Sequence, residues 1–123
     1  MNYNLDLNNR PFKAIKAGTK KVEGRTPKDS DDKRYEDIVP GDTITFTNNI
    51  TNEIMTAGVL FVHHYNNVRK MLETEGTKNV LSSGLDIEGG IKSYNSLDGY
   101  EERIKKYGIY AIGVKVKINA KIS

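Results

Sequence analysis

The stretch PFKAIKAGTKKVEGR, residues 11–25, passes from a helix into a strand within a few residues. Proline is tolerated in the first turn of a helix, and Phe12 and Ile15 stand three residues apart, so they share one helix face. Gly18 predicts the end of the helix, because glycine adopts the left-handed C-terminal conformation without a steric penalty. Residues 20–26 then predict extended structure. The stretch therefore predicts a short helix that leads directly into a strand with many charged side chains.

Four other segments predict strands, and in all of them but residues 53–65 apolar and polar residues alternate. They are residues 3–7, 43–47, 53–65 and 110–118. The last is the clearest, because every second residue from Tyr110 to Ile118 is apolar. A Pro-Gly-Asp turn at residues 40–42 precedes the second segment, and a short polar segment joins it to the third. These two segments therefore predict a hairpin.

Two later segments, residues 66–76 and 100–107, have apolar residues at helical spacing and predict helices that end at glycine. Residues 77–92 are mixed, with one short helix expected among them, and the charged residues 27–39 are expected to form an exposed loop. The strands do not alternate regularly with helices, which argues against a doubly wound parallel sheet. The sequence thus predicts a mainly β chain of the α+β class, with a small curved or closed sheet and helices beside it.

Length and composition predict a single domain over residues 1–123. Leu, Ile, Val and Phe make up 30 of the 123 residues, more than the roughly 20% below which chains tend to stay disordered. The absence of cysteine excludes disulfides, cysteine-based zinc sites and thiol nucleophiles. The N-terminal residues lack the apolar core of a signal peptide, and no run of about 18 apolar residues occurs. We therefore expect a cytoplasmic protein without membrane attachment, and the oligomeric state stays open.

The sequence contains no motif that would hold a metal ion or a phosphate-bearing cofactor. His63 and His64 are the only histidines. Neighbouring residues of a strand point to opposite faces, so these two side chains cannot bind one metal ion together. Neither of the glycine-rich phosphate-binding patterns occurs. We expect no metal and no cofactor.

Positive charge gathers in residues 10–34, which hold nine basic and four acidic side chains although the net charge of the chain is only +3. Within that range Lys20, Lys21, Glu23 and Arg25 come directly after the predicted helix end, where side chains at the start of a strand can line a cleft. A basic surface of this kind attracts phosphate. The alternative is a solvated face whose ion pairs contribute about 0–1 kcal/mol, and the pattern leaves both open.

The pattern Pro11-Phe12-x-x-Ile15-x-x-Gly18-x-Lys20-x-x-Glu23-x-Arg25 resembles the N-terminal signature of the ASCH domain family. Residues 40–42 with the strand after them, residues 68–76 and residues 107–112 are similar to further parts of the same family pattern. The resemblance extends from about residue 5 to residue 118, and the GxKxxExR element is its specific part. It implies a PUA-like β-barrel, or pseudobarrel, flanked by two to four short helices.

The resemblance also implies a cleft beside the barrel in which relatives bind RNA or a nucleotide. Lys20, Glu23, Arg25 and Glu75 would line this cleft, and Lys21 would add positive charge to it. Basic walls would hold phosphate, and an aromatic side chain such as Tyr65, Tyr94 or Tyr110 would stack on a base. RNA or a modified nucleoside is thus the expected partner.

Some small bacterial members of the family are amidohydrolases that remove the acyl group from acetylated cytidine with a lysine, a threonine and a glutamate. Lys20 matches that lysine and Glu75 the glutamate, so these two are the candidate catalytic residues. Glu23 stands where those relatives have threonine. A carboxylate there pairs with Lys20 and keeps it charged, which removes it as a base. Other relatives are linked to RNA cleavage, in which Lys20 and Glu75 would act as acid and base.

Three functions therefore stand open: RNA or nucleoside binding in the cleft, hydrolysis through Lys20 and Glu75, and protein interaction through the fold alone. Binding is favoured, because Glu23 replaces the threonine that hydrolysis would use. A residue that only lines a cleft contributes little to the core, so we expect the Lys20→Ala variant to remain folded.

Overall fold

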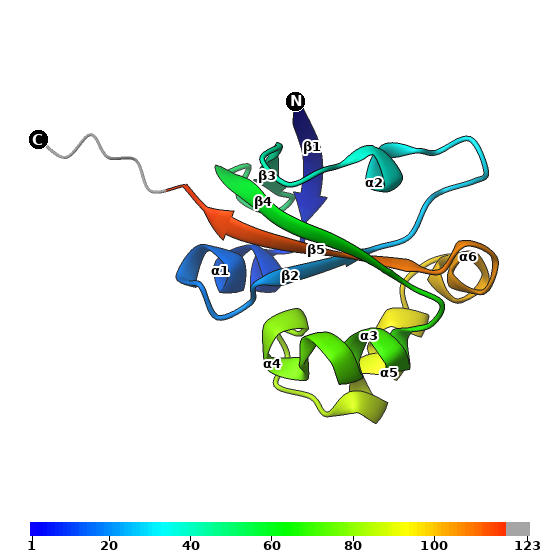
Figure 1. The fold of residues 1–123 in the computed structure, drawn as a ribbon. Coiled ribbons are helices and arrows are strands. Elements are labelled where there is room, and N and C mark those ends of the chain that lie inside the picture. Colours follow the sequence, from blue (N-terminus) through cyan, green and yellow to red (C-terminus); the bar gives the residue numbers. More distant parts are fainter. Residues whose placement is uncertain (118–123) are drawn as a thin grey trace, which may run out of the picture.

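The computed structural model describes residues 1–117, which form five strands and six helices around one curved sheet (Figure 1). The strands are β1 (Asn2–Leu7), β2 (Val22–Arg25), β3 (Thr43–Asn48), β4 (Ile54–Tyr65) and β5 (Ile109–Val116). The helices are α1 (Asn9–Ala17), α2 (Arg34–Asp37), α3 (Val68–Glu75), α4 (Thr77–Val80), α5 (Ile87–Asn95) and α6 (Tyr100–Tyr107). The expected α+β class is confirmed, with more helices than the two to four expected.

The sheet has the strand order β1-β3-β4-β5-β2, so β1 and β2 are its edges. β1 runs parallel to β3, and the other neighbouring pairs are antiparallel, including the predicted hairpin β3–β4. The Arg25 guanidinium at the end of β2 donates a hydrogen bond from Nη2 to the Asp6 carbonyl oxygen of β1, at 2.6 Å. The curved sheet therefore forms a half-barrel whose two edge strands face each other across a gap. We call this gap the seam.

Two hydrophobic clusters hold the sheet in shape. The first lies inside the curve of the sheet, where Phe12 and Ile15 of α1 pack with Phe46 of β3. The second lies between the sheet and the helices α3–α6, and Met71 and Leu72 of α3 are fully buried in it. Figure 1 shows α3, α4 and α5 gathered on one side of the sheet, with α1 beside β2. Each buried Leu, Ile, Phe or Met side chain contributes about 1.5–3 kcal/mol by leaving water.

The segment 27–39 is more ordered than the exposed loop that its charges predicted. It contains α2, and Tyr35 and Ile38 are each only 3% exposed because they pack into the first cluster. Two apolar side chains in a highly charged segment were too few to form a period, so the pattern did not reveal the contact.

The segment 77–92 contains the expected short helix, α4, but its last residues begin a second helix, α5, that the sequence did not predict. Gly89 and Gly90 disfavour a helix in isolation. Packing explains why glycine is needed at residue 90, since a Cβ on Gly90 would lie 2.7 Å from the Leu72 side chain and 2.8 Å from that of Leu81. The strand prediction for residues 110–118 is confirmed through Val116, and Ile118 lies outside the described residues.

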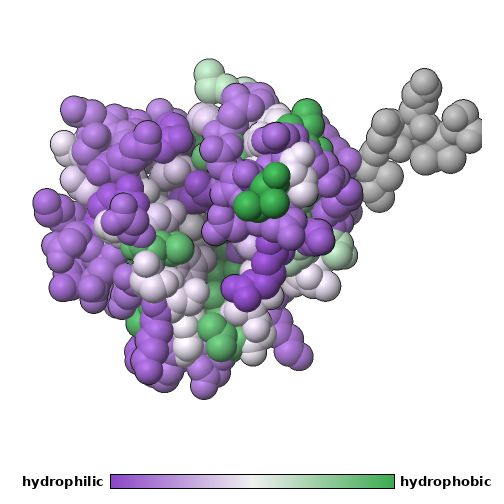
Figure 2. Space-filling view, turned by 180° about the vertical axis from the view of Figure 1, so that it is seen from behind, coloured by the Kyte–Doolittle hydropathy of each residue, from purple (hydrophilic) through white to green (hydrophobic). Residues whose placement is uncertain are grey.

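The face seen in Figure 2 is mostly hydrophilic, with a few hydrophobic side chains set among polar ones. Within residues 1–117, no helix is both long enough and apolar enough to cross a membrane.

Candidate functional site

The loop between α1 and β2 brings Lys20 into the interior. Gly18 ends α1 with φ +82°, in the left-handed conformation that glycine adopts without strain. The backbone N–H groups of Thr19 and Lys20 then donate to the Ala14 carbonyl, and that of Lys21 donates to the Asn79 carbonyl of α4. The turn therefore directs the Lys20 side chain inward, and only 4% of Lys20 remains exposed.

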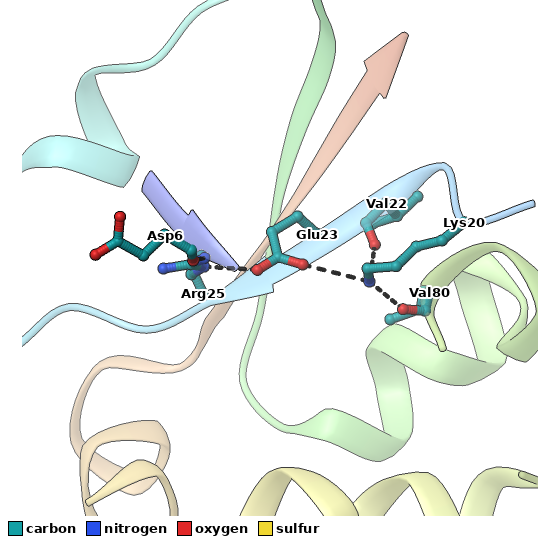
Figure 3. A network of polar contacts seen from close by, with 6 residues as sticks. All are labelled: Asp6, Lys20, Val22, Glu23, Arg25 and Val80. Atoms are coloured by element: carbon teal, nitrogen blue, oxygen red, sulfur yellow. Dashed lines mark hydrogen bonds and ion pairs between the residues drawn. The ribbon is translucent and has the colours of Figure 1, made fainter. Parts of the chain in front are cut away.

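The Lys20 ammonium group is bonded in three directions (Figure 3). Nζ donates to the carbonyl oxygen of Val22, at 2.6 Å, and to that of Val80 at the end of α4. Glu23 Oε1 lies 3.3 Å from the same nitrogen. Of the three protons of an ammonium group, two are therefore donated to carbonyl oxygens, and the Glu23 carboxylate is held as an ion pair. Burial lowers the pKa of Lys20 from its ordinary value, and the neighbouring Glu23 carboxylate opposes that shift.

Glu23 lies between two cations. Its Oε2 accepts a hydrogen bond from Arg25 Nε at 2.7 Å, while Oε1 faces Lys20. Burial alone would raise the pKa of Glu23, but the charges and hydrogen bonds of Arg25 and Lys20 outweigh it and hold the pKa below its ordinary value. Burial acts to lower the pKa of Arg25, but the Glu23 carboxylate is the main cause that outweighs burial, so the pKa of Arg25 is raised above its ordinary value. The three side chains form a buried network with one fixed negative charge, which we call the Lys–Glu–Arg network.

A cavity of about 310 Å³ opens on this network at the seam. Glu23, Gly24 and Arg25 of β2 form one wall, and Asp6 and Leu7 of β1 form the opposite edge. The remaining walls come from the start of α1, from the residues after α4, and from α5 and α6. The cavity therefore lies where the half-barrel is not closed by a strand, and we call it the seam cavity.

Two tyrosines and several neutral polar side chains also line the seam cavity. The rings of Tyr94 and Tyr100 are stacked, with centroids 6.3 Å apart and planes inclined by 21°. A Cβ at Gly24 would lie 2.5 Å from the Tyr94 hydroxyl, so glycine is required there for the ring to lie against β2. Burial raises the pKa of both phenols, which keeps them as neutral groups at the cavity wall. Ser82, Ser83 and Ser93 supply further hydroxyl groups.

The structure brings Lys20, Glu23 and Arg25 together, and it also puts Tyr94 at the same cavity. Glu75 lies elsewhere: with Lys21 it lines a second cavity of about 630 Å³, whose walls also include the end of α1 and parts of β4 and β5. Lys20 lies between the two and lines both.

The local contacts of Glu75 tie it to β4. Glu75 Oε2 lies 2.7 Å from His63 Nδ1 and accepts a hydrogen bond from the Tyr65 hydroxyl. Burial and the Glu75 carboxylate raise the pKa of Tyr65 to about 12. Tyr110 packs against Tyr35 and His64 and lines neither cavity. Within residues 1–117, no three His, Asp or Glu side chains are grouped so that they could hold a metal ion.

Sequence reasoning did not single out Arg10 or Tyr100 as site residues, although both line the seam cavity. Arg10 is exposed on α1, and no acidic side chain of the described residues forms an ion pair with it. The available signal was that Arg10 immediately precedes the segment 11–25 and belongs to the basic residues 10–34. For Tyr100 the sequence predicts only the start of a helix.

We expect acid to destabilise the fold through Glu23. Because the pKa of Glu23 in the fold lies below the ordinary 4.5, the unfolded chain takes up a proton first, so this contribution is complete above about pH 4.5 and is lost as pH falls through the folded pKa. Urea unfolding from about pH 6 to about pH 3 should show a shallower loss of stability for Glu23→Gln than for the wild type. Glu73→Gln, at an exposed position, is the control. Equal pH slopes for wild type and Glu23→Gln would contradict the ionised, charge-paired state.

Comparisons with known proteins agree on one family. The ASCH domain profile matches residues 5–117. The crystal structure of hypothetical protein PH0355 is 35% identical, with a TM-score of 0.80, and the match covers 95% of this chain and 100% of that one. The solution structure of protein PF0455 from Pyrococcus furiosus is 36% identical, with a TM-score of 0.70, over 94% of this chain and 97% of that one. A search of curated proteins gives no significant match. The half-barrel with its flanking helices is thus a PUA-like fold, and the chain belongs to the ASCH domain family.

Proposed function

We propose that the protein binds single-stranded RNA and holds one nucleotide of it in the seam cavity. The observation that carries this proposal is the composition of that cavity, in which an exposed cation, a buried charged network and two tyrosines line the same space. A volume of about 310 Å³ is at the lower end of the range for small-molecule sites. Sequence-specific RNA binding usually reads unpaired bases that have left the stack, which are held by aromatic side chains and by hydrogen bonds to their edges.

Charge at the cavity mouth supports a phosphate contact. Arg10 is exposed at its rim, and guanidinium groups bind phosphate with two parallel hydrogen bonds. Arg25 is mostly buried and already bonded to Glu23 and to the Asp6 carbonyl. Arg10 is therefore the side chain that is available for the backbone of a bound strand, whereas Arg25 shapes the wall.

Two observations favour binding over hydrolysis of an acylated nucleoside or of RNA. The Lys20 ammonium donates two hydrogen bonds to carbonyl oxygens and forms an ion pair with Glu23, so this group is engaged within the protein and is not poised to take a proton from a nucleophile. Glu75, the second candidate catalytic residue for hydrolysis, lines the second cavity and contacts His63 and Tyr65. Catalysis through this pair would require Lys20 to leave its partners.

The Arg10→Ala variant tests the proposal. We expect it to fold normally, because the side chain is exposed, and to bind a short single-stranded RNA several-fold more weakly than the wild type. The slope of log affinity against log salt should become shallower by about 0.7, the value of one phosphate contact on a single strand. Fluorescence anisotropy with a labelled RNA at several salt concentrations measures both quantities.

Lys70→Ala is the matched control, because Lys70 is exposed on α3 and does not line the seam cavity. It should leave the slope unchanged. If Arg10→Ala binds as tightly as the wild type at every salt concentration, the seam cavity is not where RNA binds. Absence of any RNA binding by the wild-type protein would overturn the proposed function itself.

A further inference from the structure

We propose that the seam cavity selects guanine, and that Glu23 is the residue that reads it. This inference rests on the proposed function, since it assumes that the cavity holds a base. The inference concerns one side chain in the cavity wall, that of Glu23, and follows from the bonds that its carboxylate makes. Glu23 lines the cavity together with Gly24 and Arg25.

Glu23 presents an acceptor to the cavity and no donor. An ionised carboxylate has two oxygens with about four lone-pair positions and no proton to donate. Within the described residues, Oε1 faces Lys20 and Oε2 accepts from Arg25, which leaves lone pairs on both oxygens. The two cations keep the group ionised, because they hold the pKa of Glu23 below its ordinary value. A base that binds here must therefore bring its own N–H groups.

The orientation of the carboxylate is set before any ligand arrives. Each oxygen is held by a different cation, at 3.3 Å on the Lys20 side and 2.7 Å on the Arg25 side. Lys20 is in turn held by the carbonyl groups of Val22 and Val80, and Arg25 by that of Asp6. Because the network is rigid and mostly buried, binding a base does not require the carboxylate to be ordered first, which removes part of the entropic cost.

Among the four bases, guanine matches this group best. Its N1–H and N2–H₂ groups lie side by side on the Watson–Crick edge and can donate to both oxygens of one carboxylate. Adenine and cytosine each offer one amino group beside a ring nitrogen acceptor. Uracil offers one N–H between two carbonyl oxygens, which a carboxylate repels. Paired donors on a base edge and a carboxylate give the two-bond geometry that discriminates strongly between bases.

The other walls fit the rest of a guanine. Its O6 acceptor is adjacent to N1 and would face the Arg25 side of the network, where a guanidinium carries more N–H donors than the Glu23 and Asp6 bonds use. Tyr94 and Tyr100 supply aromatic surface in the same cavity. Purines have the larger ring system and gain more from such contact.

The experiment measures binding of five unlabelled pentanucleotides to the wild-type protein by calorimetry. Four have the form UUXUU with X as guanine, adenine, cytosine or uracil, and the fifth carries hypoxanthine, which keeps N1–H and O6 but lacks the 2-amino group. A single guanine in a uracil context avoids the structures that guanine runs form. We expect guanine to bind at least about tenfold more tightly than the other three standard bases, and hypoxanthine to fall between.

A variant then assigns the selectivity to Glu23. Glu23→Gln keeps the shape but turns one acceptor into a donor, so the preference for guanine should shrink to less than about threefold. Circular dichroism checks that this variant is folded. Should it not fold, 1-methylguanine in the wild-type assay replaces it as the test, because the methyl group removes N1–H and should abolish the preference.

The outcomes separate this inference from the proposed function. Arg10→Ala should weaken all five RNAs by a similar factor and leave the ratios between them unchanged. Equal affinities for all five, with the salt dependence and the Arg10 effect intact, would overturn guanine selection while RNA binding at the seam stands. Tighter binding of cytosine or adenine than of guanine would also overturn it. If no RNA binds, both proposals fall.

Discussion

Lys20→Met is expected to lower the free energy of unfolding by about 3–5 kcal/mol, the usual cost of removing one partner from a buried ion pair. Methionine fills a similar volume but donates no hydrogen bond. The carbonyl oxygens of Val22 and Val80 then lose a buried donor, and Glu23 loses one of its two cations. Because Lys20 is only 4% exposed, the loss falls on buried groups. Urea unfolding at neutral pH measures the change.

Lys21→Met is the matched control, because it makes the same substitution one residue along on an exposed side chain. The backbone bonds of Lys21 to Asn79 and Val114 do not involve its side chain and remain in place. A surface change of this kind is expected to stay within about 0.5 kcal/mol of the wild type. Equal stability of the two variants would show that the bonds of Lys20 contribute little, as the sequence alone suggested for a residue lining a cleft.

Gly108→Ala is the second change with a large expected effect. Gly108 joins α6 to β5 at φ +75° and ψ −162°, a region that is essentially restricted to glycine and costs other residues about 1–3 kcal/mol. A Cβ there would also lie 2.4 Å from the Tyr65 carbonyl oxygen and 2.5 Å from His64 Nε2. Relieving that overlap moves β5 against β4 and costs about another 1–3 kcal/mol. We therefore expect a large drop in the denaturant midpoint.

Gly84→Ala separates the two causes, because Gly84 is exposed and also has φ +75°, but a Cβ there meets no atom within 4 Å. It should lose only the conformational part, about 1–2 kcal/mol. A loss for Gly108→Ala no greater than that for Gly84→Ala would mean that the β4–β5 contact yields without cost.

Much of the sheet could be predicted because its signals are local. Alternation of apolar residues identified β1, β3 and β5, and the polar segment between β3 and β4 identified their hairpin. Such a pattern depends only on residues two positions apart, so it can be read directly from the sequence. The order of the strands and the α5 helix could not be predicted, since both depend on contacts between segments distant in sequence, such as that of Gly90 with Leu72.

The candidate site divides in the same way. The sequence places Lys20, Glu23 and Arg25 close together at the start of one strand, and in the structure they form one network. No local sequence pattern predicts that Glu75 lies away from the cavity of Glu23, because the position of Glu75 depends on how α3 packs on β4. The burial of Lys20 also depends on a distant group, the Val80 carbonyl of α4.

By itself, the sequence determined the α+β class, the helix-to-strand turn at Gly18, and the charged side chains that stand close together on β2. These depend on backbone preferences and on spacing within one segment. The tertiary structure alone decided that the sheet stays open between β1 and β2, and that the cavity at this seam takes its far wall from α5 and α6. It also decided that Glu23 is buried between two cations. Burial and charge pairing are properties of groups brought together from different parts of the chain, so only the folded packing determines the chemistry of the site.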